Sequence, residues 1–219
     1  MELTIGIMGG TFDPVHCGHL IVAEEARTQL KLDQVLFVPA GQPWLKATQK
    51  VTPAYHRLAM VELAVEDEPS FCPSDMEVFR AGPSYTVDTL QELRHRVGTR
   101  AMVYLILGMD AISEIHKWSR PRKLFDMATL VAVPRPGYQG FDLRTLDDIY
   151  PGASNRVLVL NSALIAITGV EIRQRVATGQ SIKGLTPASV EAYVHKHKLY
   201  VGESARKFMH RRSGEGREH

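Results

Sequence analysis

The sequence GGTFDPVHCGH occupies residues 9–19, directly after an apolar run at residues 3–8 and directly before the apolar segment LIVAE at residues 20–24. This pattern predicts a strand that ends in a glycine turn and is followed at once by a helix. Such a junction presents unpaired backbone N–H groups and the positive end of a helix dipole to one small volume. The stretch therefore predicts a phosphate site, and with it a nucleotide.

Short apolar runs of strand length recur along the chain, at residues 34–39, 102–107, 129–133 and 156–160. Segments with helical spacing separate or follow them, at residues 53–67, 86–97, 123–127, 170–177 and 187–198, and a further helix is expected to run from Gly108 towards Trp118. Pro73 interrupts a further strand-like segment at residues 71–79, which we place at a sheet edge because proline cannot donate to a ladder. This order predicts an α/β fold: a Rossmann-like, doubly wound parallel sheet in a single domain with a C-terminal helical part.

The charge of the chain is unevenly distributed. The 219 residues carry 26 Lys and Arg against 24 Asp and Glu, a formal charge of +2, and residues 201–219 hold five of these bases and three of the acids. We therefore predict one neutral domain over residues 1–200 and a basic, disordered tail over residues 201–219. A neutral body argues against a nucleic-acid-binding face, which needs clustered Lys and Arg.

Other classes of protein are disfavoured by what the sequence lacks. No apolar run approaches the ~20 residues of a membrane helix, and the N-terminus does not have the layout of a signal peptide. Cys17 and Cys72 are the two cysteines, and their spacing indicates neither a disulfide framework nor a zinc site. These features predict a cytoplasmic protein with no resident metal site, and they leave a homo-oligomer open.

Polar or basic side chains follow the predicted strands. His16 and His19 come after the first strand, Lys46 after the second, Asp110 after the fourth and Arg135 after the fifth. Because the carboxyl ends of parallel strands share one edge, these side chains are expected to converge in one crevice. Imidazoles, a Lys, an Arg and helix N-termini together suit a polyphosphate.

His16 and His19 stand three residues apart at the predicted helix start, so their side chains can face the same way. A metal pair is one alternative, but no third ligand at a helpful spacing accompanies them. A second alternative is that each is a satisfied polar residue without a ligand. The glycine turn, Thr11 and the helix start favour phosphate over both.

The stretch at residues 9–19 resembles the signature of the nucleotidyltransferase superfamily, whose members carry a T/H-x-G-H motif and transfer a nucleoside monophosphate from a nucleoside triphosphate. Further segments follow the order and approximate spacing of bacterial nicotinate-nucleotide adenylyltransferases: SYTVDTL at 84–90, GMD at 108–110, Trp118, RPG at 135–137, IR at 172–173 and LY at 199–200. The resemblance covers residues 1–200.

This resemblance implies a reaction in NAD biosynthesis, in which ATP and nicotinate mononucleotide give deamido-NAD and pyrophosphate. The phosphate of the mononucleotide is the nucleophile, so no covalent enzyme intermediate is needed. The protein must align two phosphates and stabilise the charge at the transferred phosphorus. Mg²⁺ is expected to accompany ATP, bound largely through phosphate oxygens and water.

The resemblance also implies roles for individual residues. For catalysis it indicates His16, His19 and Lys46, with His19 donating to the α-phosphate. The ATP-binding residues that it adds are Gly9, Gly10, Thr11, Arg135, Thr168 and Arg173. The residues that it assigns to nicotinate mononucleotide are Ser84, Tyr85, Thr86, Gly108, Asp110 and Trp118. Aromatic rings can stack on the pyridinium, and free N–H groups at a helix start can receive its carboxylate.

Several interpretations stay open at this point. Without the resemblance, Trp118 is interpreted as a core aromatic, and Asp110 is equally consistent with a helix cap. Asp13-Pro14 is interpreted as a turn. A sister enzyme acting on nicotinamide mononucleotide or phosphopantetheine would be expected to lack the YTVD stretch at residues 85–88. A non-catalytic nucleotide sensor is the alternative from another class, favoured by Val170, where the family commonly has a hydroxyl-rich run.

Overall fold

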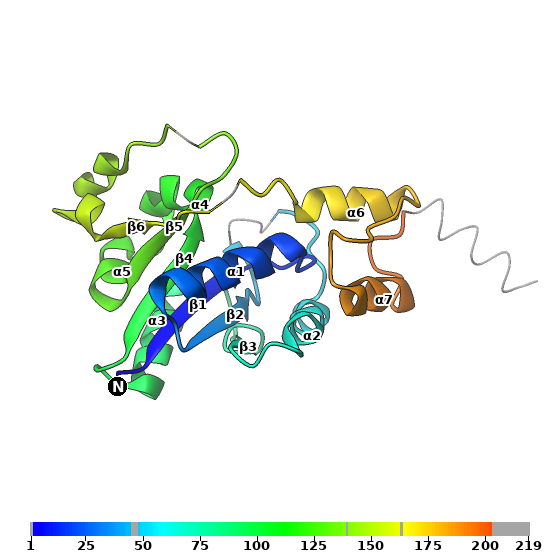
Figure 1. Ribbon diagram of the computed structural model, residues 1–219, viewed down its shortest axis with the longest axis horizontal. Coiled ribbons are helices and arrows are strands. Elements are labelled where there is room, and N and C mark those ends of the chain that lie inside the picture. Colours follow the sequence, from blue (N-terminus) through cyan, green and yellow to red (C-terminus); the bar gives the residue numbers. More distant parts are fainter. Residues whose placement is uncertain (1, 45–47, 139, 163, 203–219) are drawn as a thin grey trace, which may run out of the picture.

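The computed structural model describes residues 2–44, 48–138, 140–162 and 164–202. Within these residues, six parallel strands form one sheet in the order β3-β2-β1-β4-β5-β6 (Figure 1). The strands are β1 Thr4–Gly10, β2 Gln34–Pro39, β3 Phe71–Pro73, β4 Met102–Gly108, β5 Thr129–Val133 and β6 Val157–Val159. The chain winds outward from β1 to β3 and then restarts beside β1 with β4. This doubly wound order confirms the predicted fold class.

Helices cover both faces of the sheet. They are α1 Cys17–Leu30, α2 Ala54–Val65, α3 Thr86–Val97, α4 Met109–Ser113, α5 Pro121–Met127, α6 Gly169–Ala177 and α7 Ala188–Lys196, with short 3₁₀ turns at Ile115–Lys117, Leu143–Asp148 and Ala153–Arg156. Figure 1 places α6 and α7 at one end of the molecule, where α7 packs against α2. These two helices form the predicted C-terminal helical part.

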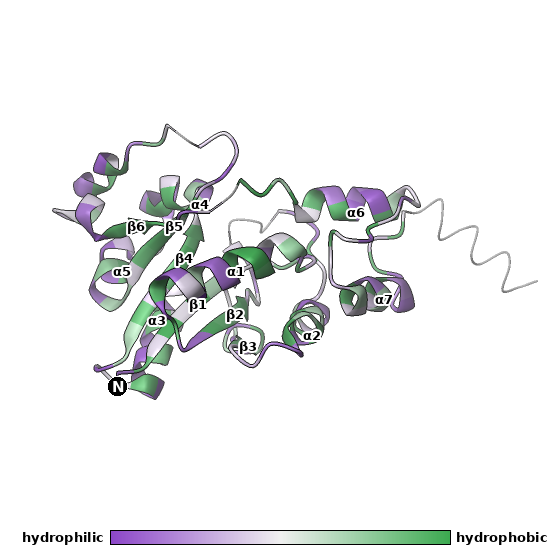
Figure 2. Ribbon diagram, viewed as in Figure 1, coloured by the Kyte–Doolittle hydropathy of each residue, from purple (hydrophilic) through white to green (hydrophobic). Residues whose placement is uncertain are grey.

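The alternation of side chains along the strands builds two cores. In β4, Leu105 and Leu107 pack into the cluster that contains α3 and α5, whereas Ile106 packs into the cluster that contains α1, α2, α6 and α7. Figure 2 shows hydrophobic residues along the strands and hydrophilic residues on the outer turns of the helices. Each such fully buried side chain contributes about 1.5–3 kcal/mol, which is why the strands read as near-continuous apolar runs.

Two predicted elements are shorter than their sequence pattern suggested. The strand-like segment at residues 71–79 pairs only over Phe71–Pro73, at the predicted sheet edge, and then continues as turns. The helix expected to run from Gly108 towards Trp118 is divided into α4 and the 3₁₀ turn Ile115–Lys117. Proline and tight local turns end the regular hydrogen bonding in both places.

Of the predicted tail, residues 203–219 lie outside the described residues. Among the helices of the described chain, none is long and apolar enough to cross a membrane.

Candidate active site

A cavity of about 370 Å³ opens at the carboxyl ends of β1 and β4, where the strand order changes direction. The sequence-predicted residues that line it are Gly9, Gly10, Thr11, His19, Ser84, Thr86, Gly108, Asp110, Trp118 and Arg135. These residues come from the ends of β1 and β4, the loop after β1, the starts of α1, α3 and α4, the end of the 3₁₀ turn Ile115–Lys117 and the turn after β5. Gly9 and Gly10 were predicted to form a turn; in the structure they are the last two residues of strand β1 and pair with β2. The topology therefore brings the predicted ATP residues and the predicted mononucleotide residues to one cavity.

Four predicted residues lie outside the lining of this cavity: His16, Tyr85, Thr168 and Arg173. The Thr168 hydroxyl accepts the backbone N–H of Glu171 at 3.1 Å and so caps α6. Arg173 donates from Nη1 to the backbone carbonyl of Asp13 at 2.7 Å, which ties α6 to the signature stretch. The predicted catalytic residue Lys46 lies outside the described residues.

The imidazole of His19 is held between two other rings. The His16 ring stacks on it with centroids 3.7 Å apart, and the Phe12 ring meets it edge-on at 4.9 Å. The backbone N–H of His16 donates to Nδ1 of His19 at 3.2 Å. An Nδ1 that accepts a hydrogen bond leaves the ring proton on Nε2. His19 is thereby oriented as a hydrogen-bond donor through Nε2.

His16 is buried behind His19, with 4% of its surface exposed. Burial, and secondly the positive charge of Arg135, lower the pKa of His16 to about 4. The ring is therefore neutral at pH 7, and its Nδ1 has no hydrogen-bond partner within the described part of the chain. Its contribution at neutral pH is to hold His19 in place rather than to supply positive charge.

The cavity wall after β4 and β5 carries Arg135, which has one donor atom without a hydrogen bond in the part of the chain that the structure describes. Nε of Arg135 is buried and finds no hydrogen-bond partner among the described residues, since the nearest carboxylate oxygen, Oδ1 of Asp110, is 3.8 Å away. A Cβ at Gly108 would lie 2.2 Å from that oxygen and 3.0 Å from Nε of Arg135. Glycine at position 108 lets the side chains of Asp110 and Arg135 approach the end of β4. The buried Nε–H of Arg135 can donate to an acceptor such as a phosphate oxygen.

The opposite wall begins at α3. Tyr85 is the N-cap of this helix and its side chain makes no cap hydrogen bond within the described chain, and Thr86 at the first helical position lines the cavity. Trp118 also lines the cavity, and its buried Nε1 has no partner among the described residues. Tyr85 itself packs beside Trp44, with ring centroids 6.2 Å apart. The aromatic side chains of Trp44 and Trp118 and the start of α3 at Thr86 therefore lie on this side of the cavity.

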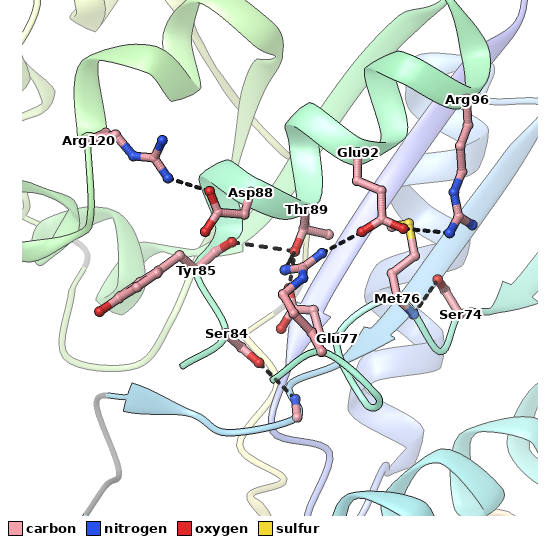
Figure 3. A network of polar contacts seen from close by, with 12 residues as sticks. Ser74, Met76, Glu77, Ser84, Tyr85, Asp88, Thr89, Glu92, Arg96 and Arg120 are labelled. Atoms are coloured by element: carbon pink, nitrogen blue, oxygen red, sulfur yellow. Dashed lines mark hydrogen bonds and ion pairs between the residues drawn. The ribbon is translucent and has the colours of Figure 1, made fainter. Parts of the chain in front are cut away.

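Figure 3 shows a polar network that was not predicted and that shares Glu77, Ser84 and Thr89 with the cavity lining. Glu77 lines the cavity, is buried, and accepts the Thr89 hydroxyl at 2.6 Å, while Arg80 donates to the same hydroxyl at 2.8 Å. Burial raises the pKa of the Glu77 carboxyl. The Ser84 hydroxyl accepts the backbone N–H of Gly41 at 2.9 Å and so fastens the loop after β2 to the start of α3. Ser84 thus has a structural partner as well as a place in the lining.

Among the cavity-lining residues that sequence reasoning missed, three have polar or aromatic side chains, namely Trp44, Glu77 and Thr89. Trp44 stands two residues before the predicted site residue Lys46, so its place in the sequence indicated that it could lie near the site. Glu77 and Thr89 belong to segments whose local pattern indicated only a strand edge and a helix. Their shared place at the cavity depends on long-range packing.

The described residues contain no group of three or more His, Cys, Asp or Glu side chains placed to hold a metal ion. The carboxylates that line the cavity are Asp110 and Glu77, and Glu77 is already hydrogen-bonded to Thr89. The residues present therefore fit a divalent cation that is held mainly by phosphate oxygens and water rather than by a protein cage.

The fold and this cavity define a nucleotidyltransferase of the Rossmann-like class, and a family model described as cytidylyltransferase-like matches residues 7–175. A nicotinate-nucleotide adenylyltransferase of Dehalococcoides mccartyi is 41% identical over 200 residues, which cover 91% of this chain and 98% of that protein. A nicotinate-nucleotide adenylyltransferase of a Roseiflexus species is 44% identical over 196 residues, with 90% and 97% covered. The chain belongs to the nicotinate-nucleotide adenylyltransferase family.

The fold comparison agrees with this assignment. Nicotinic acid mononucleotide adenylyltransferase of Plasmodium falciparum, solved as a complex with NaAD, superposes with a TM-score of 0.75 at 19% sequence identity, covering 91% of this chain and 98% of that one. At this identity the likeness establishes the shared fold. The sequence-based expectation of family and fold is confirmed.

Proposed function

We propose that this protein transfers the adenylyl group of ATP to nicotinate mononucleotide, releasing pyrophosphate and forming the deamido dinucleotide of NAD biosynthesis. In this step a phosphate oxygen of the mononucleotide attacks the α-phosphorus of ATP. The bond between the α-phosphorus and the bridging oxygen to the β-phosphate breaks, and pyrophosphate leaves. The observation that carries the proposal is the single cavity that joins the end of β1 and His19 to Thr86 and Trp118.

The ATP half of the site is formed around the end of β1. Gly9 and Gly10 at the end of β1, and Thr11 directly after it, line the part of the cavity where the triphosphate can lie, and His19 is the proposed Nε2–H donor to the α-phosphate. Arg135 supplies a buried, unpaired N–H and a positive charge for developing phosphate charge. His16 acts through His19, because it is buried and neutral. Catalysis then depends on alignment and charge stabilisation, as expected for phosphoryl transfer.

Residues at the start of α6 and in the loop after β2 complete this half of the proposal. Thr168 and Arg173 approach the triphosphate from α6, although in the structure both already make hydrogen bonds within the protein. Lys46 is a further proposed phosphate ligand and belongs to the segment outside the described residues.

The mononucleotide half is formed by α3 and the segment after α4. N–H groups at Thr86 can receive the nicotinate carboxylate, and the ring of Trp118, which lines the cavity, provides a face for the pyridinium. Tyr85, at the N-cap of α3 and outside the lining, is the second proposed aromatic contact. Asp110 and Gly108 stand where a ribose hydroxyl can be accepted. Ser84 holds the two loops of this half together through its bond to Gly41.

Mg²⁺ is proposed to enter with ATP. Its chemistry would be to neutralise triphosphate charge and to make pyrophosphate a better leaving group. Asp110 is the cavity carboxylate placed to contact its hydration shell, since Glu77 is engaged with Thr89.

One assay tests the proposal and its two alternatives. The purified protein is supplied with Mg-ATP and, in separate reactions, with nicotinate mononucleotide, nicotinamide mononucleotide or phosphopantetheine, and pyrophosphate release is followed. We expect release with nicotinate mononucleotide to be at least about tenfold faster than with the other acceptors, because N–H donors at Thr86 favour a carboxylate over an amide. Preference for either other acceptor overturns the substrate assignment. ATP binding without pyrophosphate release indicates a nucleotide sensor.

A further inference from the structure

Arg57 of α2 is the largest fully buried polar side chain of the described residues, with 1% of its surface exposed. No carboxylate of the described chain lies within ion-pair distance of it, although Asp13 and Glu77 stand near enough to favour its charge. A guanidinium without a direct ion pair in the interior costs several kcal/mol of desolvation. Packing alone therefore does not explain why this charged side chain is buried.

Its hydrogen bonds reach three separate segments of backbone. Nε donates to the carbonyl of Thr52 at 2.8 Å, Nη1 to the carbonyl of Thr11 at 2.8 Å, and Nη2 to the carbonyl of Gly41 at 3.1 Å. The planar guanidinium offers donors in a fixed fork, so the three carbonyls are held in one geometry. An ammonium group cannot reproduce this arrangement.

Each of these segments serves the cavity. Thr11 belongs to the loop after β1 and lines the cavity directly. Gly41 bonds to Ser84 and precedes Pro43 and Trp44, both of which line the cavity. The backbone N–H of Thr52 donates to the carboxylate of Asp13 at 3.2 Å, which returns to the signature stretch. Arg57 thus stands behind the site and joins its two sides.

We propose that Arg57 is a positioning residue for the transfer reaction, which holds the loop after β1 at Thr11 in register with the loop after β2 at Gly41. The inference rests on the proposed function for its kinetic consequence. The loop anchoring itself follows from the hydrogen bonds and applies whatever the acceptor substrate is. A misplacement of about 1 Å between reacting groups can lower a rate by about 10²-fold, so a residue that contacts neither substrate can still control turnover.

The chain offers a matched control in Arg94 of α3. This arginine also donates to backbone carbonyls, with Nε bonded to Met127 at 2.8 Å and Nη1 to Ala101 at 2.6 Å. None of these three residues lines the cavity. Arg57→Lys and Arg94→Lys therefore remove the same kind of interaction, and only the first removes it next to the site.

Two measurements are made on the full chain, at a temperature well below the melting temperatures of the unaltered protein and of both variants. In the transfer assay, Arg57→Lys is expected to lower kcat by about 10²-fold while Arg94→Lys changes it less than about threefold. In hydrogen exchange, the amides of Ala40, Gly41 and Thr52 are expected to lose protection in Arg57→Lys alone, because their bonds to Gly10, Ser84 and Asp13 depend on the anchored loops.

The outcomes separate the inference from the proposed function. If the unaltered protein transfers to none of the acceptors, the proposed function fails, and exchange at the three amides still decides the anchoring. Unchanged exchange and unchanged kcat in Arg57→Lys overturn the inference, as does an equal kinetic loss in Arg94→Lys. Should Arg57→Lys not fold, Arg57→Gln, which keeps an amide donor without the charge, is measured in the same way, and the same outcomes apply.

Discussion

The hydroxyl of Tyr200 donates to Oδ1 of Asp13 at 2.7 Å, joining the end of the described chain to the signature stretch across 187 positions. Burial, and secondly the carboxylate of Asp13, raise the pKa of Tyr200. The same aspartate receives the N–H of Thr52 through Oδ2 and offers its backbone carbonyl to Arg173. Asp13 is therefore a junction of four segments, where the sequence indicated only a turn.

This contact predicts a stability effect. Tyr200→Phe should lower the free energy of unfolding by about 1.5–3 kcal/mol, because the lost bond goes to a charged acceptor in a partly buried place. Urea unfolding of the full chain measures it. Tyr193→Phe is the control, because the Tyr193 hydroxyl is hydrogen-bonded at 2.9 Å to an imidazole nitrogen, Nδ1 of His56, rather than to a carboxylate. The loss of this bond should cost about 0.5–1.5 kcal/mol. Equal losses in both variants would contradict the junction role of Asp13.

His19 is predicted to act on the transition state more than on bound ATP. His19→Ala should lower kcat by about 10²–10³-fold, the usual cost of removing one donor to developing charge, while ATP affinity falls less than about tenfold. Steady-state kinetics and calorimetric titration with ATP give the two quantities. His116→Ala, at an exposed position of a 3₁₀ turn, should leave both unchanged. Comparable losses of turnover and affinity would reduce His19 to a ground-state ligand.

The buried His16 predicts a pH dependence of stability. Its folded-state pKa is about 4 against an ordinary value of 6.5, so the unfolded chain binds the proton more readily. The contribution of His16 to the free energy of unfolding is therefore fully present above pH 6.5 and is lost as pH falls towards 4. The slope from this group is at most about 1.4 kcal/mol per pH unit.

Urea unfolding across this pH window tests the slope. His16→Gln should make the curve flatter than that of the unaltered protein, and the difference between the two curves isolates the histidine. His116→Gln should keep the original slope. An unchanged curve in His16→Gln would mean that His16 is protonated equally easily in both states.

Gly41 predicts an effect on stability and on the site that arises from backbone contact. A Cβ there would lie 2.0 Å from the backbone carbonyl oxygen of Glu77, which cannot move away as a side-chain end can. Gly41→Ala should lower stability by about 1–3 kcal/mol and displace the loop that carries Trp44. Gly140→Ala is matched, because no heavy atom of the described chain lies within 4 Å of its Cβ. Thermal unfolding and kcat/KM should change in the first variant only.

The fold was largely predictable because its signals are local. Apolar runs of strand length and helical spacing recur in alternation, and a buried parallel sheet requires both. The edges of elements were less predictable: residues 71–79 form a strand only at Phe71–Pro73, because the pairing with β2 ends at Pro73 and the chain then continues as turns.

The site was predictable in part for a different reason. Residues that follow strands of a parallel sheet must share one edge, so Thr11, Asp110 and Arg135 could be placed together from their positions in the chain. The buried side of the site could not. Arg57 and Glu77 lie in segments whose patterns indicate only a helix and an edge strand, and their partners are backbone groups and hydroxyls in other segments.

The sequence by itself determined the class of fold and the family, because strand periodicity and helix starts act through neighbouring residues. Tertiary structure alone decided that the buried His16 ring stacks on His19, that Asp13 receives the hydroxyl of Tyr200, and that Arg57 joins the two loops. Burial and contacts between distant segments set those roles, and both arise only when the sheet and its helices pack together.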